Sequence, residues 1–218
     1  MNRVVNVLLL FLLIPTLLFC IYVGFDMPIS FLRMTGQNLP FRFEIFLTIG
    51  LFFMVVILRK SFRRWMGIRI VSKVTKFKWN QPVSKDRKSR VRTYLLLETA
   101  VMAFSGVALY SITEEALFPA LAFLIGALDN LLIALVSKSY RVGLSSKALI
   151  VADREVVVMY FTGLRKVSVH QQTVFFDYIK SLQLSFPLDC IQEDARDAFF
   201  EVLEEQIDRD KVFFSKIK

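Results

Sequence analysis

Four long runs of apolar residues, almost free of charge, constrain this fold more than any other feature. They extend over about residues 4–25, 43–58, 94–112 and 117–136. A helix rises ~1.5 Å per residue, so about 20 apolar residues span the ~30 Å hydrocarbon core of a bilayer. The chain is 55% hydrophobic and holds 22 Phe, which agrees with such segments. The runs therefore predict four transmembrane helices.

The first run resembles a secretory signal peptide, because Arg3 precedes it. It is longer than the apolar part of most signal peptides, and no cleavage motif of small residues follows it. We therefore expect the segment to be retained as a signal-anchor helix.

The positive charge is concentrated in one connection between predicted spans. Residues 59–93 hold 13 Lys and Arg against the single acid Asp86, although the whole chain has a net charge of +9. Basic loops stay on the cytoplasmic side of a membrane. The connection over residues 113–116 carries Glu114 and Glu115 and is expected on the outside. This pattern predicts a multi-pass protein of the cytoplasmic (inner) membrane with both termini in the cytoplasm.

The basic connection has two compatible interpretations. It is a topogenic signal, and it also contacts anionic lipid headgroups, each basic residue near the surface contributing about 1 kcal/mol. Nucleic-acid binding is not expected, because no recognisable module accompanies the charge. Within it, the β-branched residues of 68–79 favour a strand or hairpin against the C-terminal domain. The candidate headgroup or partner contacts are Arg59, Lys60, Arg63, Arg64, Arg69, Lys73, Lys76 and Lys78.

Two acids lie inside the predicted spans. Glu98 is in the third span, and Asp129, followed by Asn130, is in the fourth. The short connection makes these spans antiparallel neighbours, so both acids fall at a similar depth. Charged residues at that depth cost at least ~2.5–3.5 kcal/mol and face protein or water. We expect both to point into the bundle, plausibly toward each other. They are a packing contact, a proton or cation site, or a polar contact to another membrane protein.

The last third of the chain has a different pattern. Alternating residues predict strands over 147–152, 155–161, 164–170, 173–178 and 180–186, with a turn at Asp153-Arg154. A helix is expected from Glu193, with an apolar stripe at Ala195, Phe199, Leu203 and Ile207. The predicted division is a transmembrane domain over 1–136, including the loop 59–93, and a small cytoplasmic α+β domain over 137–218.

This C-terminal part resembles the membrane-attached bacterial PH-like domains. The resemblance is carried by Tyr140-Arg141-Val142, by residues 164–167, by Leu184-Ser185-Phe186-Pro187-Leu188-Asp189 and by the acidic helix 193–206. It implies a curled sheet closed by a C-terminal helix and used for scaffolding or binding, without a catalytic residue. Phosphoinositide binding is not expected, because the segment 137–218 has 12 charges of each sign.

Motifs of catalysis are missing from the sequence. It has no Walker loop, no dinucleotide fingerprint and no Cys or His spacing typical of a metal site. Cys20 and Cys190 are not expected to form a disulfide, and the single His170 is expected to be structural. We therefore expect no enzyme, cofactor or metal, but a scaffold or accessory subunit that presents its PH-like domain to a protein partner or another copy. The alternative is an ion- or proton-coupled transport or energy-transducing component using Glu98 and Asp129.

Overall fold

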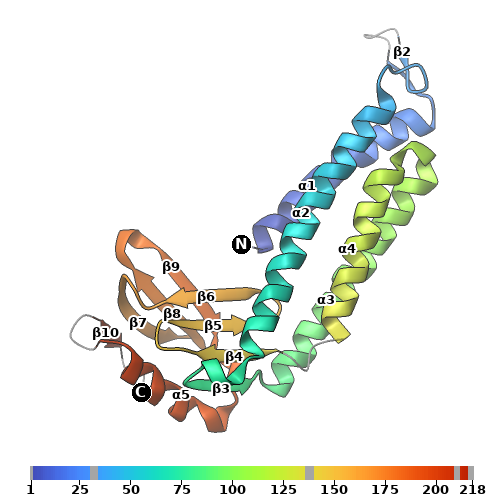
Figure 1. The fold of residues 1–218 in the computed structure, drawn as a ribbon. Coiled ribbons are helices and arrows are strands. Elements are labelled where there is room, and N and C mark those ends of the chain that lie inside the picture. Colours follow the sequence, from blue (N-terminus) through green and yellow to red (C-terminus); the bar gives the residue numbers. More distant parts are fainter. Residues whose placement is uncertain (1, 30–33, 136–139, 209–211, 216–218) are drawn as a thin grey trace. The chain divides into compact units, whose positions relative to one another are not determined.

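A computed structural model describes residues 2–29, 34–135, 140–208 and 212–215. The chain divides into two compact units, each built from two stretches of sequence. The helical unit comprises residues 1–62 and 94–133, and the sheet unit comprises residues 63–93 and 134–218. Figure 1 shows the elements in chain order. The residues 63–93, predicted to be a loop of the transmembrane domain, therefore belong to the unit of the C-terminal strands.

Four helices are long and apolar enough to cross a membrane. They are α1 (Asn2–Gly24), α2 (Arg42–Val71), α3 (Lys85–Ile112) and α4 (Leu117–Leu135). The helices α2 and α3 are longer than the apolar runs that predicted them. Both continue through basic residues because Arg and Lys are good helix formers and the basic stretches of these two helices contain no Pro.

Aromatic residues fill the interior of the helical unit. The rings of Phe53 on α2 and Phe123 on α4 lie 5.0 Å apart. Gly50 allows α2 and α4 to approach closely, since a Cβ at this position would lie 2.5 Å from the Cβ of Phe118. Large apolar side chains such as Val55 and Phe104 point outward and are exposed. An apolar exterior around an apolar interior suits a lipid environment.

Short elements connect the helices. The strands β1 (Pro28–Ile29) and β2 (Met34–Thr35) form a small antiparallel pair between α1 and α2. The 3-10 turn η2 (Glu114–Ala116) joins α3 to α4. The short η2 connection reverses the direction of the chain, as predicted for antiparallel neighbours, so α4 runs back alongside α3.

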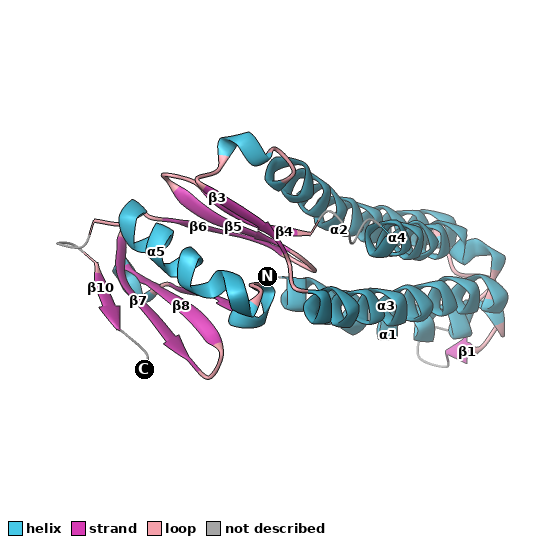
Figure 2. Cartoon of the chain, turned by 90° about the horizontal axis from the view of Figure 1, so that it is seen from below, coloured by secondary structure: helices cyan, strands magenta, loops and turns pink. Residues whose placement is uncertain are grey.

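In its described residues, the sheet unit holds two four-stranded sheets, the C-terminal helix, the end of α2 and the start of α3. Figure 2 shows the strands and helices by colour. The first sheet is antiparallel, in the order β3 (Trp79–Pro82), β4 (Arg141–Leu144), β5 (Ala148–Ala152) and β6 (Val156–Tyr160). The second has the order β10 (Phe213–Ser215), β7 (Leu164–His170), β8 (Thr173–Tyr178) and β9 (Gln183–Pro187), with β10 parallel to β7. The helix α5 (Arg196–Gln206) follows the second sheet in sequence.

Five strands and the last helix confirm the sequence prediction with small shifts of their ends. The strand predicted within 68–79 is wrong in position, because residues 68–71 are the last turn of α2 and the turn η1 (Val74–Lys76) follows. The strand is β3, which pairs with β4 from Trp79↔Leu144 to Pro82↔Arg141. Pro82 is tolerated as the last residue of this strand, which lies at the edge of the sheet.

The core of the sheet unit is aromatic and joins the first sheet to α5. Trp79 on β3 lies 5.1 Å from Phe199 on α5, measured between ring centroids. Phe186 on β9 lies 6.1 Å from the same phenylalanine. The end of α2 also packs on the first sheet, since any Cβ at Gly143 would lie 2.8 Å from the Phe77 ring and 3.1 Å from Val71. The segment 63–83 is therefore part of this fold.

Candidate functional site

A buried ion pair joins three helices of the helical unit. The Lys60 ammonium on α2 pairs with the Glu98 carboxylate on α3 and donates a 2.8 Å hydrogen bond to Asn6 Oδ1 on α1. The two charged side chains are only 6% and 13% exposed. A charge in a water-poor interior is tolerated when an opposite charge and hydrogen bonds compensate for lost hydration. The pair therefore holds Glu98 as a neutralised contact between α2 and α3.

The second acid also has its partner on α2. The Ser61 hydroxyl donates a 2.7 Å hydrogen bond to Asp129 Oδ1 on α4. The neighbouring Asn130 is 2% exposed, and its amide nitrogen lies 3.3 Å from Met102 Sδ on α3. Consecutive residues of α2 thus contact acids on two different helices. The buried polar cluster, defined here as Asn6, Lys60, Ser61, Glu98, Asp129 and Asn130, links all four helices.

Sequence analysis identified both acids but not Lys60, which was assigned to the basic connection by its charge. The spacing of Lys60 from the buried residues of α2 could have identified it as an inward-facing residue. Phe53, Ile57, Lys60 and Arg64 follow one another at spacings of four, three and four, and all are buried. Such spacing places residues on one face of a helix. Lys60 therefore continues the inward face of α2.

The eight basic residues proposed as headgroup contacts divide into two groups. Lys60 and Arg64 are buried, at 7% and 2% exposure, so we no longer count these two among headgroup contacts. Burial raises the pKa of Tyr140, a residue of the sheet unit, to about 12, and the positive charge of Arg64 opposes this rise. The remaining six, Arg59, Arg63, Arg69, Lys73, Lys76 and Lys78, are exposed.

Polar contacts also order the opposite ends of the helices. Arg42 Nε, in the first turn of α2, lies 2.7 Å from Glu115 Oε1 in η2. The carboxylate of Asp26 accepts a 2.8 Å hydrogen bond from the Gln37 amide, which lowers the pKa of Asp26. These contacts fix the connections that were predicted to lie outside the membrane.

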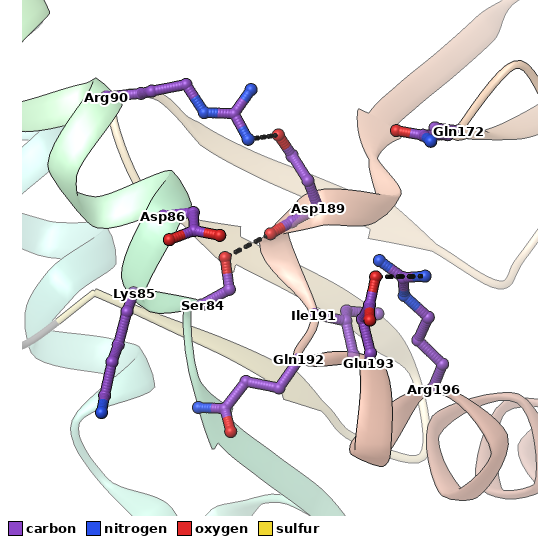
Figure 3. Close-up of a pocket in the computed structure, with 10 residues that line it drawn as sticks. All are labelled: Ser84, Lys85, Asp86, Arg90, Gln172, Asp189, Ile191, Gln192, Glu193 and Arg196. Carbon is purple, nitrogen blue, oxygen red and sulfur yellow. Dashed lines mark hydrogen bonds and ion pairs between the residues drawn. The ribbon is translucent and has the colours of Figure 1, made fainter.

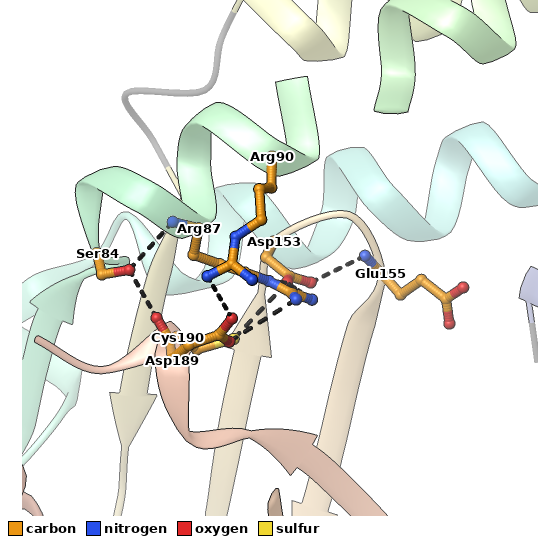
Figure 4. A network of polar contacts seen from close by, with 7 residues as sticks. All are labelled: Ser84, Arg87, Arg90, Asp153, Glu155, Asp189 and Cys190. Atoms are coloured by element: carbon orange, nitrogen blue, oxygen red, sulfur yellow. Dashed lines mark hydrogen bonds and ion pairs between the residues drawn. The ribbon is translucent and has the colours of Figure 1, made fainter. Parts of the chain in front are cut away.

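A second polar network lies in the sheet unit (Figure 4). Arg87, in the first turn of α3, donates from Nε and Nη2 to Asp153 Oδ2 at 3.0 and 2.8 Å. Arg90 Nη2 lies 3.0 Å from Asp189 Oδ2, and Ser84 Oγ donates to the Asp189 carbonyl at 2.6 Å. This network connects the start of α3 to the turn after β5 and to the segment after β9.

Cys190 lies in the same network, with Sγ 3.7 Å from Asp153 Oδ2. The thiol is fully buried. Burial raises the pKa of Cys190, and the negative charge of Asp153 raises it further. Since the thiolate is the reactive form, this cysteine is a poor nucleophile at neutral pH. The network is built for stability and offers no activated nucleophile here.

A pocket of about 480 Å³ opens beside the network (Figure 3). Its volume is within the range of ~300–1,000 Å³ typical of small-ligand and side-chain sites. Three basic and three acidic side chains line it with neutral groups, so its charge is balanced. The lining residues are Ser84, Lys85, Asp86, Arg90, Gln172, Asp189, Ile191, Gln192, Glu193 and Arg196. Arg196 Nη1 is 3.6 Å from Glu193 Oε1, a loose pair that an incoming group can displace.

Within the described part of the chain, no three His, Cys, Asp or Glu residues are grouped to hold a metal ion. No protein-family model, curated protein or solved structure matches the chain. The resemblance to PH-like domains therefore stays a prediction. The described part of the chain thus holds a mixed-charge pocket on the sheet unit and a cluster of compensated charges inside the helical unit.

Proposed function

We propose that this chain is a non-enzymatic scaffold or accessory subunit of a membrane. In this proposal the four helices are embedded in the bilayer, and the sheet unit, a PH-like domain by resemblance, is presented in the cytoplasm to a protein partner. The pocket beside Asp189 receives part of that partner.

The pairing of β3 with β4 is the observation that carries this proposal. β3 lies between α2 and α3 in the sequence, whereas β4 follows α4. The chain therefore enters the sheet unit, leaves it for two helices, and returns. Such a unit is tied to the predicted membrane spans through three connections and not through one flexible linker. This is an arrangement suited to presenting a surface.

The charge distribution supports the cytoplasmic side. The exposed residues Arg59, Arg63, Arg69 and Lys73 belong to the stretch between α2 and α3, and the short connection between α3 and α4 holds Glu114 and Glu115. The excess of Lys and Arg in cytoplasmic loops is a general rule of membrane topology. Both termini lie on that same side in this proposal.

The contacts of the two acids favour a packing role over ion coupling. A carboxylate that exchanges a proton or cation must be released from its partner at some point of the cycle. Glu98 is instead paired with the Lys60 ammonium, and Asp129 accepts a hydrogen bond from Ser61. The ion-coupled alternative would need these contacts to open.

Site-specific photocrosslinking in intact cells tests the proposal. A photoreactive residue replaces Lys85, which is exposed and lines the pocket. The matched control places it at the exposed Tyr160, outside the pocket. We expect one protein adduct from position 85, identified by mass spectrometry, and none from position 160. Identical adducts from both positions, or lipid adducts alone, would contradict the proposal.

The identified partner then allows a second test with purified components. Arg196→Glu in the pocket should abolish its binding to the full-length chain in nanodiscs. Arg165→Glu, an exposed substitution on β7, should leave binding unchanged. Reporter fusions after residues 75 and 215 test the topology, and signals from the outer side would refute it.

A further inference from the structure

An exposed row of apolar side chains continues along α2 beyond its apolar run. Phe62, Met66 and Ile70 are 65%, 45% and 43% exposed. They are spaced by four residues and therefore follow one another along one side of the helix. Isolated apolar residues on a surface need no explanation, but an ordered row indicates a contact.

Basic residues share this face of α2. At 3.6 residues per turn, Arg59, Arg63 and Arg69 fall within the same sector of about 120° as the apolar row. All three are exposed. The buried residues Lys60, Arg64, Gly67, Ile68 and Val71 lie on the other side of the helix. Apolar and basic side chains are thus interleaved on one face and not separated onto two.

The buried polar cluster sets the depth of this face. Lys60 is level with Glu98, which lies four residues from Tyr94 at the start of the third apolar run. Asp129, the partner of Ser61, lies six residues before the end of α4. At ~1.5 Å per residue the cluster is therefore about 6–9 Å inside the apolar zone. Counted from Lys60 along α2, the same distance of about 6–9 Å ends at residues 64–66, which therefore mark the edge of the apolar zone on this helix.

The headgroup layer comes next. It is about 5–7 Å thick on each side of the hydrocarbon core, which corresponds to about four more residues of helix. Met66 therefore falls at the edge of the hydrocarbon, and Ile70 falls within the headgroup layer. The apolar run, which ends at Leu58, underestimates how far α2 contacts lipid.

We propose that this face of α2, comprising Phe62, Met66 and Ile70 with Arg63 and Arg69, together with Lys73 just after the helix, is an interfacial binding surface for anionic lipids. The apolar side chains insert at the boundary of acyl chains and glycerol, and the basic groups reach the lipid phosphates. A bilayer surface accepts both kinds of side chain at once. A partner helix would have to supply a well-placed acid for each of the interleaved basic groups, because burying a charge without compensation is costly.

Fluorescence quenching in nanodiscs tests the surface in the full-length chain. Cys20 and Cys190 are both fully buried, so an introduced cysteine is labelled selectively. An environment-sensitive probe is placed by Met66→Cys or Ile70→Cys, and lipids carry a quencher near the headgroup. The nanodiscs contain phosphatidylcholine alone or mixed in equal parts with phosphatidylglycerol. Val55→Cys within α2 and Leu182→Cys in the sheet unit are controls with similarly exposed apolar side chains.

We expect quenching at positions 66 and 70, stronger with phosphatidylglycerol, and none at 182. Solvent-like probes at 66 and 70 beside a lipid-exposed probe at 55 would overturn this inference alone. A solvent-like probe at 55 would instead refute the membrane embedding proposed above, on which the inference rests.

The charge contribution is tested separately. Arg69→Gln with Lys73→Gln should reduce the enrichment of phosphatidylglycerol in copurifying lipid by up to about fivefold for each residue removed. The control, Lys147→Gln with Arg165→Gln, removes two exposed charges elsewhere and should leave the enrichment unchanged. Equal enrichment in both variants would overturn the role of the basic groups.

Discussion

The two units use the same chemical device in different surroundings. In the helical unit Lys60 pairs with Glu98, and in the sheet unit Arg87 pairs with Asp153. Lys60 and Glu98 are 6% and 13% exposed, while Arg87 is 23% exposed. Arg87 also lies within 3.7 Å of Asp189, so it has two acidic partners. Asp153 itself is 7% exposed, so the carboxylates of both pairs are largely shielded from water, but the second pair belongs to a network with a further acid and a more exposed guanidinium.

This difference teaches where each charge is indispensable. Removing the cation of the Lys60–Glu98 pair leaves a carboxylate in an apolar interior without its opposite charge, which is strongly destabilising. In a network near solvent, a second partner or water replaces much of the lost interaction. The cost of each substitution should therefore follow the isolation of its pair and not the number of contacts.

The largest effect is expected for Lys60→Met, which leaves the Glu98 carboxylate buried without its cation. We expect the free energy of unfolding of the full chain in detergent to fall by about 3–5 kcal/mol. The double variant Lys60→Met with Glu98→Leu should recover most of this loss, because it removes both charges. If the double variant is no more stable than the single one, the pair is not the cause.

Arg87→Met comes next. Asp153 would lose the guanidinium that donates two hydrogen bonds to Oδ2. A loss of about 2–3 kcal/mol is expected for hydrogen bonds to a charged group. Hydrogen exchange should show faster exchange in β4–β6 and unchanged protection in α1 and α4. Faster exchange in the helical unit as well would show that the two networks are not separable.

A smaller effect is expected for Ser61→Ala, which removes the hydroxyl that donates to Asp129. Hydrogen bonds between helices in membranes contribute on average about 0.6 kcal/mol, so we expect a loss near 1 kcal/mol. Ser72→Ala is the matched control, because Ser72, just after α2, donates from Oγ to the Ile68 carbonyl in the last turn of α2 at 2.8 Å and contacts no other helix through this bond. Thermal unfolding that ranks the control as more damaging would contradict the assignment.

The smallest effect is expected for Arg90→Gln. The Arg90 side chain is 66% exposed, although it lies 3.0 Å from Asp189. Exposed pairs contribute at most about 1 kcal/mol and are weakened by salt. The free energy of unfolding should therefore fall by less than about 1 kcal/mol at low ionic strength, and it should not change measurably at high salt. If the effect did not depend on salt, the Arg90–Asp189 pair would be shielded from solvent like Lys60–Glu98, and the prediction would be wrong.

Elements with strict periodicity were predictable from sequence. Apolar and polar side chains alternate along much of β7 and β8, and the apolar content of the four long helices identifies them in the sequence. By contrast, β4 is four residues long and contains Gly143, and β10 has only three residues. Such segments become strands because neighbouring strands offer them hydrogen bonds. That information lies in the tertiary structure and not in the local pattern.

The two acids of the candidate site could be predicted from the sequence, but their partners could not. Glu98 and Asp129 are conspicuous because acids are rare inside apolar runs. Their partners on α2 were missed because Lys60 follows the apolar run and was grouped with other cations by charge sign. Arg87 was counted with the same cations, and its acidic partners lie far along the chain. Helical spacing in the sequence is sufficient to place Lys60 on the inward face of α2. The partners of Arg87 cannot be identified from the neighbouring sequence, because only the tertiary fold brings them close.

The pairing of β3 with β4 has a consequence for biosynthesis. Residues 79–82 are synthesised before α3 and α4, and their neighbours at 141–144 follow only afterwards. At ~5–20 residues per second the intervening chain takes roughly 3–12 s to translate. During that interval β3 is a strand without a sheet. Synthesis of α3 and α4 must therefore precede completion of the first sheet, and nascent chains halted before residue 141 are expected to be substrates for chaperones.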